Sequence, residues 1–403
     1  MPPISTRSGT NSKKERRFRA TGRVLSPSEI LQRLIAIPSV NPDCDPGEQA
    51  AGEGKLASYL AEFLKRLGAK VSLQEVLPGR PNVIAVWEAA SDAPHLVFAP
   101  HTDTVGVKGM TIDPFRPVRK NGRIYGRGAA DTKGPMAAVL WALQMWSNQK
   151  GKIRDRLRVS FVGLMGEEAG NEGAIALVQG GFQARLVVVC EPTDLQVVYA
   201  HKGALWFKLR AIGKACHGST PERGVNAIEH MAFLLPQFKK DLLQALSQRA
   251  SPLGAATLNF GIIQGGRAIN IVPDCCEVSC DLRFPASWKA QEIWQLVRRY
   301  INQSSFRAKA ELIRKAPGLA TRADDLWIRM LAKAGRGLTT APWFCDAAIF
   351  GEKKIPSVAF GPGSIAQAHT AEEFILERQL QSGARAYWSF LQSVAQLSGQ
   401  DVE

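Results

Sequence analysis

The feature that most constrains the fold is a repeated alternation of short apolar runs with helical segments. Apolar runs of strand length occupy residues 82–88, 95–100, 156–165 and 184–190. Their lengths and their flanking turn residues are typical of buried strands. The second and third runs are separated by a helical segment at 135–146. Because parallel strands need crossover connections, usually helices, this alternation predicts a mostly parallel, doubly wound α/β sheet.

A second pattern interrupts the first one near residue 200. From about residue 200 to 316 the order of segments becomes strand, helix, strand, strand, helix, strand. This is the order of the ferredoxin-like split motif, and it predicts a separate α+β unit. The α/β alternation then returns and ends in a helix that begins at about Phe374. We therefore expect one α/β domain at 26–199 and 317–403, with an inserted domain at 200–316.

The N-terminal segment differs from the rest of the chain in charge. Residues 1–25 hold seven Lys or Arg and one Glu, and they lack the apolar core of a secretory signal. We expect a disordered basic tail there. Ser26, Pro27 and Glu29 follow as a capping box that predicts the start of a helix. The net charge of +15 suits anionic ligands, but no basic–aromatic stripe or nucleic-acid module accompanies it, so no nucleic-acid partner is expected.

Composition also bears on the cellular compartment. No apolar run reaches the roughly 18 residues of a membrane span, so no membrane partner is expected. The seven cysteines are irregularly spaced and form no paired zinc-binding framework. Without an export signal, this usage predicts reduced thiols and a cytoplasmic protein.

Potential metal ligands and acids follow the apolar strands or precede a helix. In open α/β sheets, sites form beyond the carboxyl ends of the strands, so side chains at those ends can converge. The residues in question are His101, Asp103, Asp131 in a Gly-rich loop, Glu167, Glu168, Glu191 and His369.

The adjacent Glu167 and Glu168 need an explanation, because like charges beside a buried strand repel each other. Taken singly, each feature has a simpler interpretation: adjacent glutamates in a loop are usually solvated, and Asp131 suits a turn. The joint occurrence with two of only six histidines favours a pair of divalent cations. Imidazole and carboxylate ligands fit zinc, with cobalt or manganese tolerated, and one carboxylate can bridge both ions. One glutamate would then bind metal while its neighbour acts as a general base.

At these residues the chain resembles a known family of dinuclear-zinc amidohydrolases and peptidases. This family includes acetylornithine deacetylase, succinyl-diaminopimelate desuccinylase, aminoacylase-1 and carboxypeptidase G. The resemblance runs in family order from about residue 26 to the C-terminus, and it implies a zinc-peptidase-like catalytic domain with an inserted lid and dimerisation domain. The matching stretches are "PHTDTV", "GRGAADTKG", "GEEAG", "CEPTD", "GKACHGSTPERGVNAI", "NIVPDCCEVSCDLRF" and "FGPGSIAQAHTAEEF".

The resemblance implies two zinc ions per subunit, which cobalt or manganese could replace. His101, Asp131 and Glu191 would hold one ion, and Asp131, Glu168 and His369 would hold the other. Asp131 would therefore bridge them. The peptide bond that follows Asp131 is expected to be cis.

The resemblance also implies roles around the metals. Glu167 would be the general base and then the general acid, and Asp103 would orient His101. His217 would come from the inserted domain of a partner subunit and stabilise the oxyanion, which implies a homodimer through that domain. The residues expected to hold the substrate carboxylate are Asn270, Arg283 and the backbone N–H groups of Gly361 and Gly363.

The expected reaction is hydrolysis of the amide bond of an N-acyl amino acid. The stretch "WFCDAAIF" is most similar to the acetylornithine deacetylase branch, which favours deacetylation of a small-molecule substrate. Desuccinylation and carboxypeptidase or dipeptidase action are the alternatives within the family. A more remote alternative is a relative that kept the fold for binding and lost catalysis.

Overall fold

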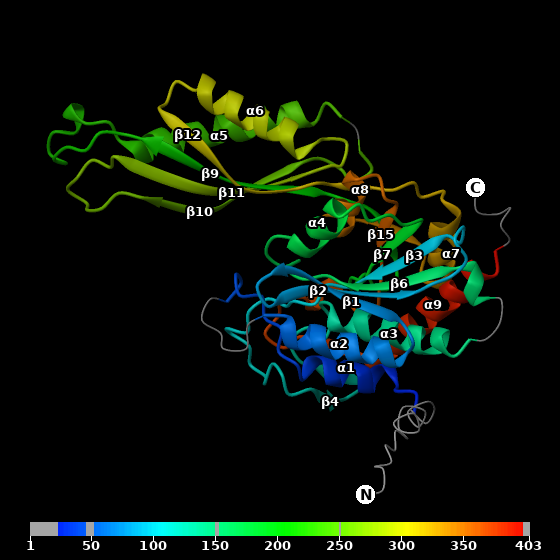
Figure 1. The fold of residues 1–403 in the computed structure, drawn as a ribbon. Helices are drawn as coiled ribbons and strands as arrows, with labels where there is room; N and C mark the ends of the chain where they lie inside the picture. The colour runs from blue at the N-terminus through cyan, green and yellow to red at the C-terminus, as the bar shows by residue number, and fades with distance from the viewer. Residues whose placement is uncertain (1–22, 46–51, 150–152, 250, 398–403) are drawn as a thin grey trace, which may run out of the picture.

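The structure is a computed structural model that describes residues 23–45, 52–149, 153–249 and 251–397. The basic tail expected at 1–25 lies outside the described residues except for its last three positions. Figure 1 shows a larger unit built on one sheet and an elongated smaller unit built on another. Among the described residues, no helix is both long and apolar enough to cross a membrane.

The larger unit is built on a nine-stranded sheet with strand order β1-β2-β6-β3-β7-β15-β8-β13, in which β14 also pairs with β8. The strands are β1 (Lys70–Leu77), β2 (Arg80–Trp87), β3 (His95–Ala99), β6 (Arg158–Gly163), β7 (Leu186–Val189), β8 (Val197–His201), β13 (Leu319–Ala320), β14 (Leu338–Ala341) and β15 (Ser357–Ala359).

Parallel and antiparallel pairs both occur in this sheet. Strands β6, β3, β7 and β15 pair in parallel, and so do β14 and β8, whereas β1 with β2, β2 with β6, and β8 with β13 and β15 pair antiparallel. The prediction of a mostly parallel sheet therefore holds for the run from β6 to β15 but not for the sheet as a whole. One physical reason is the short β1–β2 connection, in which Gly79 has a φ of 71°, because a tight turn can join only antiparallel strands.

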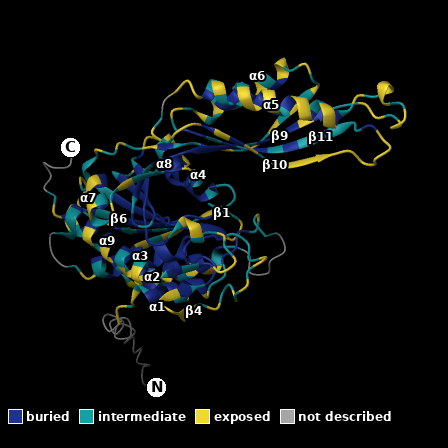
Figure 2. Ribbon diagram, turned by 180° about the vertical axis from the view of Figure 1, so that it is seen from behind, coloured by how far each residue is buried: buried dark blue, intermediate teal, exposed yellow. Residues whose placement is uncertain are grey.

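Helices cover both faces of the sheet, which confirms the doubly wound α/β class. In β3, Leu96 and Phe98 face one core, while Val97 and Ala99 face the other, so the strand is buried on both sides. Figure 2 shows this buried centre. The first core packs against α1 (Pro27–Ile35), α2 (Gly54–Arg66), α3 (Lys133–Ser147), α7 (Leu326–Ala334) and α9 (Glu377–Ala395), and the second against α4 (Glu172–Gln179) and α8 (Ala347–Glu352).

The smaller unit has the predicted ferredoxin-like order. Its four-stranded antiparallel sheet has the order β10-β11-β9-β12, and its helices pack on one face. In β11, every second side chain is buried against these helices, as expected for a sheet with one covered face. The elements are β9 (Gly203–Ile212), α5 (Ala227–Leu246), β10 (Thr257–Gly265), β11 (Cys275–Phe284), α6 (Ala290–Gln303) and β12 (Ala308–Ala316).

The ends of the chain follow the sequence signals with one difference. The side chain of Ser26 accepts the N–H of Glu29, and the capping box starts α1 as predicted. The helix expected from about Phe374 is preceded by a short strand, so α9 begins at Glu377. That strand belongs to a small sheet of β4 (Val118–Lys120), β5 (Arg123–Tyr125) and β16 (Phe374–Leu376), and short 3₁₀ turns lie at Arg154–Arg156, Pro221–Arg223 and Ile365–Gln367.

Candidate metal centre

The predicted ligands lie at the carboxyl ends of neighbouring strands. His101 follows β3, Glu168 follows β6 and Glu191 follows β7, and these strands are adjacent and parallel. Asp131 precedes α3, and His369 ends a loop that follows β15 and contains the 3₁₀ turn Ile365–Gln367. The pairing of the strands therefore brings together side chains that are far apart in sequence.

Two groups of ligand atoms share Asp131. The ligand atoms of His101, Asp131 and Glu191 lie within 4.8 Å of one another, and so do those of Asp131, Glu168 and His369. Nε2 of His101 lies 3.0 Å from Oδ1 of Asp131, and Nε2 of His369 lies 3.4 Å from its Oδ2. Each oxygen of Asp131 thus faces one histidine, which is the arrangement of a bridging carboxylate.

Burial and charge give this cluster unusual acid–base properties. Burial raises the pKa values of Glu167 and Glu191 well above the ordinary range, and it raises that of Glu168. Burial opposes ionisation of Asp131 too, but the hydrogen bonds from His101 and His369 lower its pKa. Buried carboxylates in contact repel each other unless positive charge lies between them.

The donor set fits divalent cations. Oε1 of Glu168 is buried and has no hydrogen-bond partner among the described atoms, so this oxygen is available to a cation. Two imidazoles and three carboxylates are ligands that zinc accepts, and cobalt and manganese accept them too. The residues that the sequence predicted as two ligand triads therefore form two triads in space.

Asp103 holds several of these residues in place from behind. Its Oδ1 accepts the N–H of Glu167 at 3.1 Å and lies 3.3 Å from Nδ1 of His101. Its Oδ2 accepts the N–H of Glu168 at 3.0 Å and an amide hydrogen of Asn41 at 2.8 Å. One carboxylate thus orients both the imidazole and the backbone that carries the paired glutamates. The cis bond expected after Asp131 is present.

The predicted oxyanion donor His217 and the predicted substrate residue Asn270 lie at the distal end of the smaller unit. Strand β9 begins beside the larger sheet at Gly203, so the loop after Ile212 that carries His217 is remote from that sheet (Figure 1). The backbone carbonyl of Asn270 accepts the N–H of Gly218, so the two predicted residues are neighbours. Both are exposed, and no hydrogen bond or ion pair joins either of them to the metal cluster among the described residues.

The other predicted substrate residues already have partners. Nε of Arg283 donates to Asp281 at 2.8 Å, and its guanidinium lies over the ring of Phe344. The N–H of Gly361 donates to Oγ1 of Thr193. Gly363 has a φ of 95° and its carbonyl accepts the N–H of residue 194.

Three polar groups near the site, two of them buried, are absent from the predicted site residues. Glu53 pairs with Arg80 and accepts the N–H of Gly166. Arg314 of β12 donates to Asn171 at 2.6 Å, which links the smaller unit to the loop after Glu168. The third group is Glu373, whose carboxylate accepts hydrogen bonds from the loop before Asp131. Glu53 and Glu373 belong to no periodic pattern, and Arg314 alternates with its neighbours in β12 as any strand residue does, so no sequence signal set them apart.

Comparisons with known proteins extend over most of the chain. The model of Peptidase family M20/M25/M40 matches residues 97–393. Acetylornithine deacetylase from Proteus mirabilis is 29% identical over 386 residues, covering 93% of this chain and 95% of the relative. Acetylornithine deacetylase from Shigella sonnei is 31% identical over 361 residues, covering 87% and 93%. The crystal structure of a tripeptidase from Staphylococcus aureus is similar with a TM-score of 0.75 and 22% identity, covering 92% and 98% of the two chains.

Proposed function

Because the chain belongs to Peptidase family M20/M25/M40, we propose that it removes the acyl group from N-acyl amino acids. The chain is a hydrolase that acts on amide or peptide bonds, and metal-dependent amide hydrolysis is its general chemistry. The choice of an N-acetyl amino acid is supported by two relatives named acetylornithine deacetylase that align with almost the whole chain. The observation that carries the mechanism is the pair of ligand triads sharing Asp131.

Two divalent cations, zinc by preference, would be held by the two triads. His101 and Glu191 would complete one site, His369 and Glu168 would complete the other, and Asp131 would serve both. When bound, such a pair polarises the acyl oxygen and acidifies the attacking water. The seven free thiols of the chain suit a cytoplasmic setting, which we propose as well.

Glu167 is the proposed proton carrier. Burial raises the pKa of its carboxyl group, its backbone N–H donates to Asp103, and it belongs to neither ligand triad, so this carboxyl group can carry a proton at the cluster. Glu167 would take a proton from the attacking water and return it to the leaving amine nitrogen.

His217 is the proposed oxyanion donor. The N–H of Ser219 donates to its Nδ1, so a neutral ring carries its own proton on Nε2 and can donate it to a developing oxyanion. Because His217 lies at the distal end of the smaller unit, we propose that a second copy of the chain supplies it. Asn270 would act beside His217, and Arg283 would bind the substrate carboxylate after exchanging its contact with Asp281.

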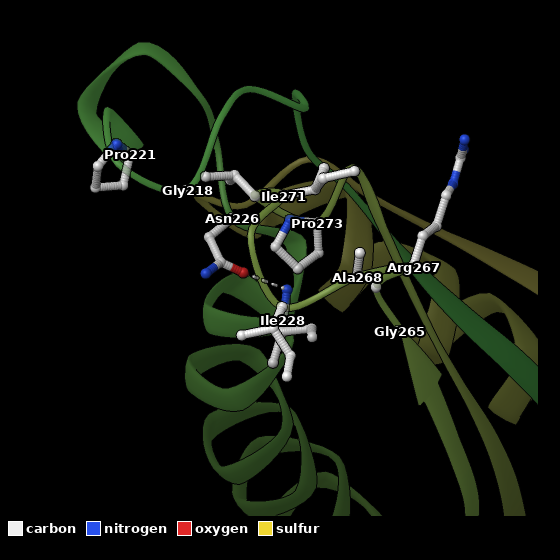
Figure 3. Close-up of a pocket in the computed structure, with 12 residues that line it drawn as sticks. Gly218, Pro221, Asn226, Ile228, Gly265, Arg267, Ala268, Ile271 and Pro273 are labelled. Carbon is white, nitrogen blue, oxygen red and sulfur yellow. Dashed lines mark hydrogen bonds between the residues drawn. The ribbon is translucent and has the colours of Figure 1, made fainter.

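The surface around His217 supports a homodimer through the smaller unit. Eight of the fourteen exposed large apolar side chains among the described residues lie between residues 203 and 316, although this unit is the smaller one. They include Ile262 and Ile263 on the edge strand β10, which is largely exposed in Figure 2. Figure 3 shows an adjoining cavity of about 620 Å³, lined by Gly218, Ile271 and the first turn of α5. Exposed apolar patches of this kind are typical of protein interfaces.

The activity is tested with a substrate panel. N-acetyl, N-succinyl and dipeptide substrates are incubated with protein reconstituted with zinc or cobalt, and a chelator-treated sample is the control. We expect chelator-sensitive release of an amino acid from N-acetyl substrates. Cleavage of N-succinyl substrates or dipeptides alone would assign a different branch of the family. Failure to cleave any of them with about two metals bound would refute the proposal.

The shared site is tested by mixing two inactive variants. A His217→Ala chain retains Glu167, and a Glu167→Gln chain retains His217, so a mixed dimer contains one complete site. Random exchange would make half of the dimers mixed and restore about a quarter of wild-type turnover. Unmixed variants are the control, and sizing chromatography reports the dimer. A monomer, or no recovery after co-refolding, would remove His217 of the partner subunit from the site.

A further inference from the structure

Glu373 is a buried carboxylate for which the proposed reaction has no use. Its side chain is fully shielded from solvent, and its two oxygens accept four hydrogen bonds. Oε2 accepts from Nη1 of Arg127 at 2.8 Å and from the N–H of Gly128 at 2.9 Å. Oε1 accepts from the N–H groups of Ala130 at 2.8 Å and Asp131 at 3.0 Å. The last donor belongs to the residue that both ligand triads share.

The shape of the donor loop explains why its N–H groups converge. Gly128 has a φ of 82°, which turns its N–H and the following ones toward one point and forms an anion-binding nest. A side chain at Gly128 would also lie 2.9 Å from the stem of the buried Lys133. The loop therefore adopts its conformation around a carboxylate that comes from a distant part of the chain.

The same carboxylate belongs to the segment that carries His369. Glu373 follows His369 by four residues, and its own carbonyl accepts the N–H of Gly126 at 3.0 Å. Strand β16 continues directly from Glu373 and pairs with β5, and the carbonyl of Ala371 accepts the N–H of Thr111. One end of Glu373 is thus fixed to the His369 segment, and the other end is fixed to the Asp131 loop.

We propose that Glu373 is a positioning residue that sets the separation of Asp131 and His369 and thereby the affinity of the triad formed by Asp131, Glu168 and His369 for its cation. This inference rests on the proposed metal function. Glu373 touches no ligand side chain, and it acts through the backbone of Asp131. Groups that orient metal ligands in this way typically change metal affinity by 10–100-fold when they are replaced.

The variant Glu373→Gln tests the role of the charge with little change in volume. An amide can accept hydrogen bonds on one oxygen only, so its NH₂ group would face two donors, either Arg127 and Gly128 or Ala130 and Asp131. The matched control is Glu377→Gln, four residues later. Glu377 also pairs with an arginine, Arg119, but accepts no N–H from the metal-binding loop.

The experiment titrates metal-free proteins with Co²⁺ alone and follows visible absorption, with a competing chelator to measure affinity. For wild type we expect two bound ions. For Glu373→Gln we expect one ion to bind about 10–100-fold more weakly, with a changed absorption spectrum. Glu377→Gln should bind both ions as wild type does, and thermal unfolding of the metal-free proteins separates altered affinity from lost folding.

The outcomes distinguish this inference from the proposed function. Wild type that binds no Co²⁺ would refute the metal centre itself. Two ions bound by Glu373→Gln with wild-type affinity and spectrum, or an equal weakening in Glu377→Gln, would overturn only the role of Glu373. If Glu373→Gln does not fold, Glu373→Asp retains the charge at a shorter reach and should still weaken one ion; wild-type affinity in that variant would refute the inference.

Discussion

The buried pair Glu53–Arg80 gives a stability prediction that can be worked out from its contacts. Glu53 is fully buried and Arg80 is 8% exposed. Nε and Nη2 of Arg80 donate to the two carboxylate oxygens at 2.7 and 2.8 Å, and the N–H of Gly166 donates to Oε1 at 3.2 Å. The pair therefore lies directly behind the backbone that leads to Glu167 and Glu168.

Glu53→Gln should lower the free energy of unfolding by about 3 kcal/mol. The glutamine can keep its oxygen toward Gly166, but its NH₂ group then faces the Nε–H of Arg80, and the guanidinium loses its counter-charge. Removing one partner of a buried pair typically costs about 3–5 kcal/mol. The lower end applies here because Asp43, which is largely exposed, lies 3.5 Å from Nη1 and offsets part of the charge.

The double variant Glu53→Gln/Arg80→Met should be less destabilised than the single variant, with a loss of about 1 kcal/mol. Burial raises the pKa of Glu53 despite the bonds from Arg80, so the attraction within the pair does not fully offset the desolvation of the carboxylate. Removing both charges therefore removes the desolvation cost of the carboxylate together with its attraction to the guanidinium.

The assay is equilibrium urea unfolding of the metal-free proteins, followed by tryptophan fluorescence and circular dichroism. Glu62→Gln is the matched control, because Glu62 forms an exposed ion pair with Arg66 and its loss should leave the midpoint unchanged. The reasoning is refuted if Glu53→Gln unfolds within about 1 kcal/mol of wild type, or if the double variant is no more stable than the single one.

Three further predictions concern the proton carrier, an acid-sensitive core group and the metals. Glu167→Gln should bind metal as wild type does while turnover falls by about 10²–10⁴-fold. Steady-state rates are measured together with metal content, and wild-type turnover in this variant would contradict the proposed role of Glu167. Burial lowers the pKa of His201 to about 4 in the folded chain, so between about pH 6.5 and 4 the unfolded chain binds a proton that the folded chain does not, and stability falls with the pH. Melts recorded as a function of pH should show about 3 kcal/mol less loss in His201→Asn than in wild type, and equal losses would contradict this. Chelation should lower the melting temperature and added zinc should restore it, and a melting temperature indifferent to chelator would count against the centre.

The order and type of most elements follow from local signals. The capping box at Ser26 starts a helix, and the strand–helix order between 203 and 316 produces a ferredoxin-like sheet. The convergence of the ligands was predictable from sequence because parallel strands place their carboxyl ends together, which puts His101 and Glu191 at one edge, whereas the division into two triads came from the resemblance. The resemblance of the motifs then assigned Asp131 to both triads.

What the sequence could not supply depends on contacts between distant segments. The antiparallel pairs of the main sheet depend on which strands meet, and no local sequence pattern encodes that choice. Glu373 and Glu53 are isolated polar residues outside any periodic pattern, so only the folded chain reveals their hydrogen-bond partners. The roles of His217, Asn270, Arg283 and the glycine loop remain predictions, since a single chain does not bring them together.

The pairing of β8 with β13 makes the chain modular. His201 pairs with Leu319 and Ala200 pairs with Ala320, so the two ends of the segment between them are held side by side, about 5 Å apart. A segment whose two ends lie this close can be inserted or removed without moving the strands of the larger unit. A two-residue turn in its place would close β8 and β13 into an ordinary hairpin. The pairing of the larger sheet is thus continuous across the point where the smaller unit leaves it and returns.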